Sequence, residues 1–285
     1  MDIIGHFSNK GLRNYKILEK IDEGRMSVIH RAIRLADDAL VALKLLNRDA
    51  IVLRNALKKK LPDIDSKILS IEHKNVIKTF EFGGRGSRQY ISIEYLHGLT
   101  LGKIAKRRLA SIRQLIEYFI QVCEGLNYMH EKAGIVHRDF NPFNVIVNEK
   151  NICKIVDLDF AFERVDDTRG IFRRSGTLGY LAPEQVRGKN LDHRIDIYAI
   201  GASMYEIMTR HNPYRDTSSA STALRREKTL SNHLIVTPSA PSMHNSEIPP
   251  LLDDVILKCV QINREERYKN VAEVKRDLEK CFEKL

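Results

Sequence analysis

Alternating apolar and polar positions dominate the first third of the chain. The segments I-L-E-K-I, S-V-I-H-R-A-I, L-V-A-L-K-L-L and Y-I-S-I-E-Y lie between residues 15 and 95 and combine short apolar runs with a period near two. This pattern predicts strands. Apolar spacing at Ile64 to Ile71 is helical and predicts one helix among them.

Beyond Leu99 the apolar spacing is that of helices. The clearest helical segments are Ile112 to His130, Arg194 to Thr209, Leu251 to Gln261 and Val271 to Phe282. The stretch from Arg215 to Pro250 contains T-S-S-A-S-T-A and T-P-S-A-P-S, so we predict a long loop there. A small strand-rich part followed by a larger helical part predicts an α+β fold.

The length of 285 residues suits one large two-lobed unit or two small domains. No apolar stretch approaches the roughly 18 residues of a membrane span, and the N-terminus lacks a cationic region leading into an apolar run. We therefore expect a cytoplasmic protein without a membrane segment. The four cysteines lack the paired spacing of zinc sites or disulfide frameworks, so we expect buried, reduced thiols.

The net charge of +10 comes partly from the runs L-K-K-K, Leu57 to Lys60, and K-I-A-K-R-R, Lys103 to Arg108. Such runs are usually solvated helix faces, and docking of an acidic partner or substrate is the alternative. No zinc-finger or RNA-binding signature accompanies the charge, so we expect no nucleic-acid partner.

Four motifs follow one another in an informative order. Lys44 ends the strand segment V-A-L-K, His137 to Asn144 reads H-R-D-F-N-P-F-N, and Asp157 lies in K-I-V-D-L-D-F. The string G-T-L-G-Y-L-A-P-E then runs from residue 176 to 184. Together they resemble the catalytic domain of eukaryotic-like serine/threonine protein kinases, and the ending L-L-D-D-V-I-L-K-C-V-Q-I-N-R-E-E-R-Y is most similar to bacterial members.

The resemblance implies a two-lobed fold, with a small antiparallel β-sheet lobe containing one main helix and a larger, mainly α-helical lobe. The implied bounds are an N-terminal extension at 1–14 and a kinase domain at 15–285. Within that domain, 15–95 forms the lobe with the ATP-covering hairpin, and 96–285 carries the catalytic and activation loops.

The resemblance also implies the roles of the catalytic residues, with ATP and Mg²⁺ as cofactors. Asp139 would orient the substrate hydroxyl and accept its proton, and Lys44 would contact the α- and β-phosphates. Asn144 and Asp157 would bind Mg²⁺. Asp159 competes for the second metal position, although the spacing and the preceding apolar strand favour Asp157.

Nucleotide contacts are expected in the first lobe. The segment Ile21 to Ala32 resembles the phosphate-covering hairpin, and Tyr90 to Leu101 resembles the strand and hinge beside the adenine. Backbone groups of Glu94 and Leu96 would bond the purine, while Ile93 would gate the pocket behind it. The expected cofactor-binding residues are Ile21, Gly24, Ile29, Ala42, Lys44, Ile93, Glu94 and Leu96.

Three further positions match supporting roles in the family. Thr177 resembles the Thr that contacts the catalytic Asp in Ser/Thr kinases. Glu184 would form a buried ion pair with Arg267, and Asp196 would support the backbone of the catalytic loop.

Two departures from the family pattern lie near the reacting groups. Asn141 stands where Ser/Thr kinases place a Lys that contacts the γ-phosphate, which removes a charge-stabilising contact. The D-F-G motif is D-L-D, so Leu158 replaces Phe and Asp159 replaces a Gly that can take unusual backbone angles.

Two more departures concern the first lobe. The helix that should offer a Glu to Lys44 offers Asp63 or Asp65, and an ordinary acidic first turn after Pro62 is the alternative. The family pattern has three glycines in the phosphate-covering hairpin. This chain has only Gly24 of the three, with Asp22 and Ser27 at the other two positions.

The leading function is therefore transfer of the γ-phosphoryl group of Mg-ATP to Ser or Thr hydroxyls of a protein substrate. Arg138 is typical of kinases whose activation loop is ordered by phosphorylation, so we expect self-phosphorylation at Thr168 or Ser175. Two solvent-exposed hydroxyls without such a role are the alternative. The alternative is a pseudokinase that binds nucleotide or a partner with little or no phosphotransfer. A small-molecule phosphotransferase is third, because A-P-E and the Thr177 segment serve protein substrates. A homodimer through the small lobe is one arrangement left open.

Overall fold

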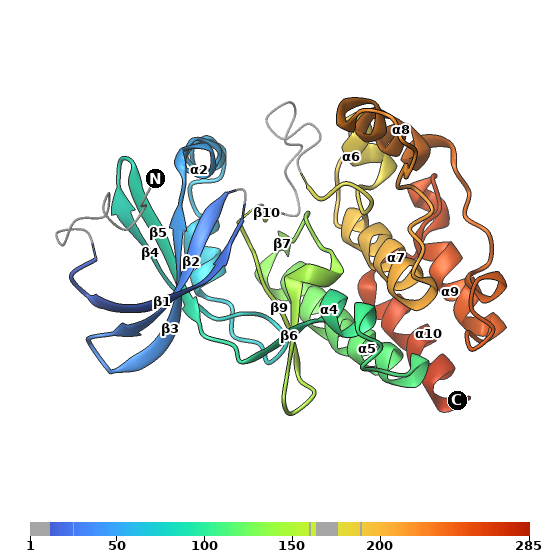
Figure 1. Ribbon diagram of the computed structural model, residues 1–285, viewed down its shortest axis with the longest axis horizontal. Coiled ribbons are helices and arrows are strands. Elements are labelled where there is room, and N and C mark those ends of the chain that lie inside the picture. Colours follow the sequence, from blue (N-terminus) through green and yellow to red (C-terminus); the bar gives the residue numbers. More distant parts are fainter. Residues whose placement is uncertain (1–11, 25, 160, 164–175, 189) are drawn as a thin grey trace. The chain divides into compact units, whose positions relative to one another are not determined.

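The computed structural model describes residues 12–24, 26–159, 161–163, 176–188 and 190–285. The chain folds into two compact units (Figure 1). The first contains the residues up to 73 together with 77–97, and the second contains 74–76 and 98–285. Thr168 and Ser175, the expected phosphorylation sites, lie outside the described residues.

An antiparallel sheet forms the first unit, as the alternating pattern predicts (Figure 1). Among the described residues it has five strands in the order β1-β2-β3-β5-β4. Their bounds are β1 Tyr15–Glu23, β2 Ser27–Arg34, β3 Ala39–Leu46, β4 Thr79–Arg85 and β5 Arg88–Glu94.

Strand β3 lies in the middle of this sheet and is buried on both faces. Val41, Leu43 and Leu45 pack into one apolar cluster, whereas Leu46 packs into another cluster with Ile91. Because successive side chains of a strand point to opposite faces, the continuous run L-V-A-L-K-L-L is what a doubly covered strand requires.

The first unit has a helix that the sequence pattern did not predict. Besides the short α3, Ile64–Leu69, the structure has α2, Arg48–Lys60, which contacts β3. Asn47 begins α2, because its side chain accepts a hydrogen bond from the Ala50 amide at 3.0 Å. Five Lys and Arg residues in thirteen positions hide the narrow apolar stripe that packs against the sheet.

Helices make up most of the second unit, so the expected α+β class is confirmed. Its α-helices are α4 Leu101–Lys106, α5 Ile112–Tyr128, α6 Pro183–Arg187, α7 Arg194–Thr209, α8 Thr222–Ile235, α9 Pro250–Cys259 and α10 Val271–Glu283. Shorter helices are η1 Met129–Ala133, η2 Pro142–Asn144, η3 Pro241–Met243 and η4 Arg264–Glu266. Its strands are β6 Gly98–Thr100, β7 Ile135–Val136, β8 Val145–Asn148, β9 Cys153–Ile155 and β10 Phe162–Glu163.

The prediction of a loop from Arg215 to Pro250 is wrong over α8. Ser221 begins this helix by accepting a hydrogen bond from the Leu224 amide at 3.4 Å. Only Thr229, Leu230 and His233 of the helix are buried, so its apolar face is too narrow to stand out in the pattern.

The four cysteines are reduced and buried, as expected. Burial raises the pKa of each thiol, to about 12 for Cys153 and to about 11 for Cys281. None of the helices in the described ranges is long and apolar enough to cross a bilayer.

Candidate active site

The catalytic-loop segment, residues 137–144, follows β7 and is fixed by Asp196 of α7. The Asp196 carboxylate accepts hydrogen bonds from the backbone amides of His137 and Arg138, both at 2.8 Å. It also bonds His130 Nε2 at 2.7 Å. Burial alone would raise the pKa of Asp196, but these partners hold it below its ordinary value. Asp196 thus supports the loop backbone as the resemblance implies.

The backbone of this segment is strained at Arg138, whose φ is +71°. A non-glycine residue in the left-handed region costs about 1–3 kcal/mol and persists where the surroundings over-determine it. Here the amide of Arg138 is held by Asp196, and its carbonyl accepts a hydrogen bond from Gln185 Nε2 at 3.0 Å.

Asp139 lies at the centre of a small hydrogen-bond network. Its Oδ1 accepts from the Thr177 amide at 2.7 Å, so Thr177 contacts the aspartate as expected. Its backbone carbonyl accepts from Asn144 Nδ2 at 2.9 Å and from Asn141 Nδ2 at 3.0 Å. Two asparagine amides and one backbone amide therefore fix both the backbone and the carboxylate of Asp139.

Asn141, which replaces the expected Lys, has a clear structural role. Its Nδ2 also lies 3.3 Å from Thr177 Oγ1, and its Oδ1 accepts from the Phe143 amide at 3.0 Å. The side chain thus links the loop to the segment around Thr177. It brings no positive charge to the site, because the amide is neutral.

Asp157 is the second residue after β9, and its charge acts on Asp139. Its φ is +65°, a left-handed conformation that Asp adopts more readily than bulky residues. The preceding Val156 amide donates to the Asn144 carbonyl at 2.9 Å, which ties the two expected metal ligands together. Burial raises the pKa of the Asp139 carboxyl, the Thr177 hydrogen bond opposes this rise, and the Asp157 charge adds to it.

The donor set suits a magnesium ion. Mg²⁺ takes oxygen ligands, commonly one or two from the protein and the remainder from phosphates and water. Because Asn144 donates its Nδ2 to Asp139, its Oδ1 is the atom left for a metal, and Asp157 adds a carboxylate. Asp159 lies two residues further along, after the buried Leu158.

The expected nucleotide residues of the first unit share one face of its sheet. Lys44 on β3 lies opposite Ile29 of β2 and Ile91 of β5, and Ala42 lies opposite Ile93. Directly opposed residues of antiparallel strands point to the same face, and Ala42 and Lys44 are two positions apart. This face therefore carries apolar side chains and two cations: the buried Lys44, which is 7% exposed, and Arg31, which lies opposite Ala42 and pairs with Glu19.

The hairpin between β1 and β2 closes at Gly24, whose amide donates to the Ser27 carbonyl at 2.9 Å. The pairing shifts register between Lys20 and Asp22, so Ile21 lies at the irregularity. Asp22 is exposed, and its Oδ1 accepts from the Glu23 amide at 2.8 Å.

The two candidate partners of Lys44 differ in their surroundings. Asp65 on α3 binds Arg54 at 2.5 Å and Lys58 at 2.7 Å, both from α2. Asp63 precedes α3, and its backbone carbonyl accepts from Ser66 Oγ at 2.7 Å.

Glu184 and Arg267 form the expected buried ion pair. Arg267 Nη1 and Nη2 bind the two carboxylate oxygens at 2.7 and 2.8 Å, and the Arg267 side chain is fully buried. The arginine also donates to the carbonyl of Gln261 at 2.7 Å. A two-pronged pair of this kind fixes the start of α6 to the segment before α10.

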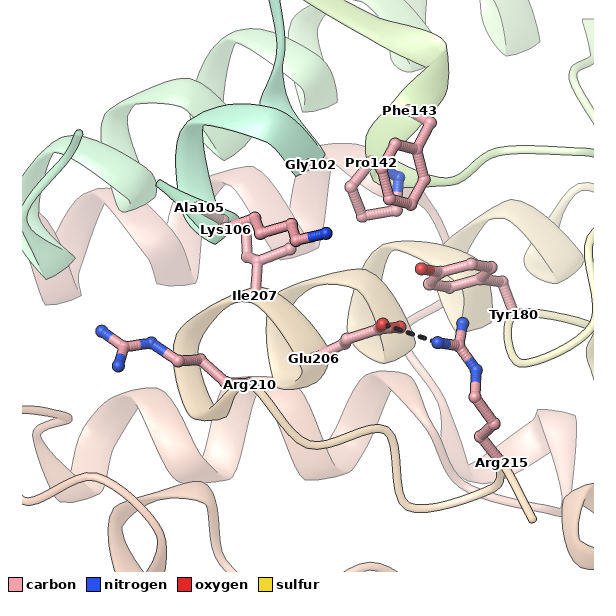
Figure 2. A pocket seen from close by; sticks show the side chains of 10 residues that line it. All are labelled: Gly102, Ala105, Lys106, Pro142, Phe143, Tyr180, Glu206, Ile207, Arg210 and Arg215. Atoms are coloured by element: carbon pink, nitrogen blue, oxygen red, sulfur yellow. Dashed lines mark ion pairs between the residues drawn. The ribbon is translucent and has the colours of Figure 1, made fainter. Parts of the chain in front are cut away.

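Sequence reasoning missed a pocket of about 350 Å³ in the second unit (Figure 2). Residues of α4, η2 and α7 line it, together with Tyr180, Arg210 and Arg215. The signals were present but ambiguous, because Lys106 lies in the run K-I-A-K-R-R, which equally suits a solvated helix face.

The fold and these contacts define a protein kinase domain. The family model for the protein kinase domain matches residues 15–277, and the chain belongs to this family. Membership implies ATP as the phosphoryl donor and a divalent metal ion. The expected family and fold are thereby confirmed.

Curated relatives are bacterial. A probable serine/threonine-protein kinase of Clostridium acetobutylicum is 32% identical over 262 residues, covering 91% of this chain and 38% of the relative. Serine/threonine-protein kinase PknB of Mycolicibacterium smegmatis is 30% identical over 285 residues, covering 94% and 43%. PknB of Mycobacterium tuberculosis is 30% identical over 274 residues, covering 93% and 42%. The chain spans about two fifths of the length of these relatives.

Proposed function

We propose that the chain is an ATP-dependent serine/threonine protein kinase of bacterial type, which acts in signalling by phosphorylating other proteins. The observation that carries this proposal is the fixed position of Asp139. Its carboxylate is held by the Thr177 amide, and its backbone is held by Asn144 in a loop that Asp196 anchors. Positioning of this kind is most of what phosphoryl transfer asks of a protein.

In the proposed reaction Asp139 orients the Ser or Thr hydroxyl of the substrate. The hydroxyl oxygen forms a bond to the γ-phosphorus while the bond to the β,γ-bridging oxygen breaks, so ADP leaves. The hydroxyl proton passes to the Asp139 carboxylate. Thr177 and Asn144 keep the carboxylate and its backbone in place throughout.

Asn144 and Asp157 are the proposed metal ligands. A bound Mg²⁺ would neutralise negative charge on the phosphates. The protein contributes one amide oxygen and one carboxylate, and the link from Val156 to Asn144 holds the two residues together.

The nucleotide is proposed to contact the sheet face around Lys44. The ammonium would bind the α- and β-phosphates, while Ile29, Ala42 and Ile93 would contact the purine through apolar surface. Ile21 and Gly24 at the hairpin, and the backbone of Glu94 and Leu96, remain the expected further contacts.

Self-phosphorylation at Thr168 or Ser175 is the proposed activating event, since a phosphate there would gain Arg138 as a partner. Mass spectrometry of active protein should find phosphate on one of them, and active protein with neither modified would contradict the proposal. The homodimer and the cytoplasmic location stay predictions.

A pseudokinase is the second candidate, and Asn141 is the observation that favours it. The Asn141 amide keeps the loop connected to Thr177 but supplies no charge to a γ-phosphate. Losing one charge-stabilising contact in the transition state typically costs about 10²-fold in rate.

Purified chain incubated with γ-labelled ATP, Mg²⁺ and a mixture of Ser- and Thr-containing peptides separates the two candidates. An active kinase labels Ser or Thr, and Asp139→Asn abolishes the label while ATP binding, measured by calorimetry, persists. ATP binding without label in the unsubstituted chain would instead establish the pseudokinase.

A further inference from the structure

Figure 2 shows the pocket of about 350 Å³. Hydrogen bonds connect both of its walls to Asp139. On one side, the Phe143 amide donates to Asn141, which in turn donates to the Asp139 carbonyl. On the other side, the Tyr180 amide donates to the Thr177 carbonyl at 3.2 Å, and Thr177 contacts the Asp139 carboxylate. A polypeptide that presents a hydroxyl to Asp139 therefore has this pocket beside it.

The carboxylate in the pocket is already neutralised by the chain itself. Glu206 Oε1 pairs with Arg215 Nη1 at 3.5 Å, and Glu206 Oε2 accepts from Asn212 Nδ2 at 2.8 Å. Figure 2 shows Arg215 reaching across to Glu206. A substrate arginine would have to displace Arg215 to reach this acid.

Positive charge exceeds negative charge around the pocket. Lys106, Arg210 and Arg215 line it together with a single carboxylate, that of Glu206. The Lys106 ammonium points toward the middle of the pocket (Figure 2). An anionic side chain would be attracted there and a cationic one repelled.

Tyr180 supplies a hydrogen-bond donor in the same place. The residue is 3% exposed, and its hydroxyl lies beside Glu206 and Arg215 without a hydrogen bond of good geometry to either. In Figure 2 this hydroxyl points into the pocket. Burial raises the pKa of Tyr180, and the nearby Glu206 adds to the rise, so the group stays protonated. This hydroxyl donor suits a ligand that brings an acceptor.

An apolar wall faces these polar groups. The Phe143 ring is 51% exposed and packs against Gly102, where a Cβ atom would lie only 2.7 Å from the ring. Pro142 and Ile207 continue the wall. The methylene groups of a Glu side chain fit such a surface while its carboxylate meets the donors.

We propose that this pocket binds an acidic residue of the protein substrate, close in sequence to the phosphorylated Ser or Thr. The proposal rests on the proposed kinase function and gives its substrate class: hydroxyl residues flanked by Asp or Glu rather than by Arg or Lys. It also accounts for the cationic run at the end of α4 through Lys106.

Binding of labelled peptides tests the proposal independently of phosphate transfer. A Thr-containing peptide with Ala at all flanking positions is compared with peptides that carry Glu or Arg at each position in turn, using fluorescence anisotropy at low salt. We expect Glu at one or two positions to tighten binding about tenfold relative to Arg there. Equal or tighter binding of every Arg peptide would overturn the proposal.

Two variants sharpen this test. Arg215→Ala frees Glu206, so the preference should swing toward Arg peptides by about tenfold, whereas Lys106→Gln should merely reduce the preference for Glu. Arg107→Gln, an exposed neighbour that does not line the pocket, is the matched control and should behave like the unsubstituted chain. A preference for Glu that survives both Arg215→Ala and Lys106→Gln would assign recognition to another surface and refute the proposal.

The same peptides, supplied with labelled Mg-ATP, separate this inference from the kinase proposal. Label on the Ala and Arg peptides at least equal to that on the Glu peptides would leave the kinase standing and overturn the acidic preference. Selective binding of Glu peptides without any label would support the pocket and contradict the kinase.

Discussion

The catalytic loop and the adjoining pocket lie side by side in the second unit but use their polar groups differently. In the loop, the amides of His137 and Arg138 and the carbonyl of Asp139 all have protein partners. In the pocket, the Tyr180 hydroxyl has no hydrogen bond of good geometry to the Glu206 and Arg215 side chains beside it, and cations outnumber acids. Internal bonding fixes atoms that must not move during a reaction, whereas donors left over are suited to an outside molecule.

Asp139→Asn should produce the largest effect on the loop side of this comparison. The amide cannot accept the hydroxyl proton, so kcat should fall by about 10²- to 10⁴-fold. Single-turnover phosphorylation of a peptide substrate measures it. Tyr180→Phe is the contrasting variant, and its rate on an all-Ala peptide should stay within about threefold of the unsubstituted chain. A large loss of rate in Tyr180→Phe would contradict the separation of the catalytic loop from the substrate-binding pocket.

Arg267→Met should cost the most stability. It leaves the Glu184 carboxylate buried without its partner, so the free energy of unfolding should drop by about 3–5 kcal/mol. Chemical denaturation followed by circular dichroism gives the value. Arg267→Lys keeps the charge but loses the two-pronged geometry, so its loss should be smaller. Equal losses in the two variants would show that geometry outweighs charge at this pair.

Asp196→Asn should weaken the attachment of the catalytic-loop segment to α7. Weakened bonds to the amides of His137 and Arg138 should lower the free energy of unfolding by about 1–3 kcal/mol. Because the Asp196 pKa lies below its ordinary value in the fold, its stabilising effect is complete above about pH 4 and lost on further acidification. The difference from the unsubstituted chain should therefore shrink toward pH 3, and a difference that grows would contradict this assignment.

Asn141→Lys should have the smallest effect, in the favourable direction. A lysine would add a cation near the γ-phosphate but lose the link to Thr177, so we expect kcat to rise about tenfold rather than the full 10²-fold. Steady-state kinetics with varied ATP measures it. An unchanged or lower kcat would show that the hydrogen bond from Asn141 to Thr177 contributes at least as much to the rate as a cation near the γ-phosphate would.

Much of this molecule was predictable because its strongest signals are local. The strands follow from period-two patterns and, for β3, from a continuous apolar run, and the order of Lys44, Asp139, Asn144 and Asp157 identified the family. Helices α2 and α8 were not predicted, because each buries only a narrow apolar face and has many charged or polar residues besides. Asn47 and Ser221 begin these helices by accepting capping hydrogen bonds. In the sequence, however, Asn and Ser are equally typical of turns.

The pocket could not be predicted because it depends on pairings between distant positions. Nothing in the sequence says that Arg215 neutralises Glu206, or that both side chains lie beside the Tyr180 hydroxyl. The same holds for Asp65, which sequence spacing offers to Lys44 and which the fold pairs with Arg54 and Lys58. Charge runs such as K-I-A-K-R-R acquire meaning only when their neighbours are known.

The positions of the four cysteines allow unfolding of the second unit to be followed by thiol labelling. Cys123, Cys153, Cys259 and Cys281 all lie in the helical unit, buried and with raised pKa values. Thiol reagents attack thiolates, so the native chain should react slowly until that unit unfolds. The labelling rate would therefore measure unfolding of the second, helical unit. Unfolding of the first unit alone, which contains the five-stranded sheet and no cysteine, would not change it.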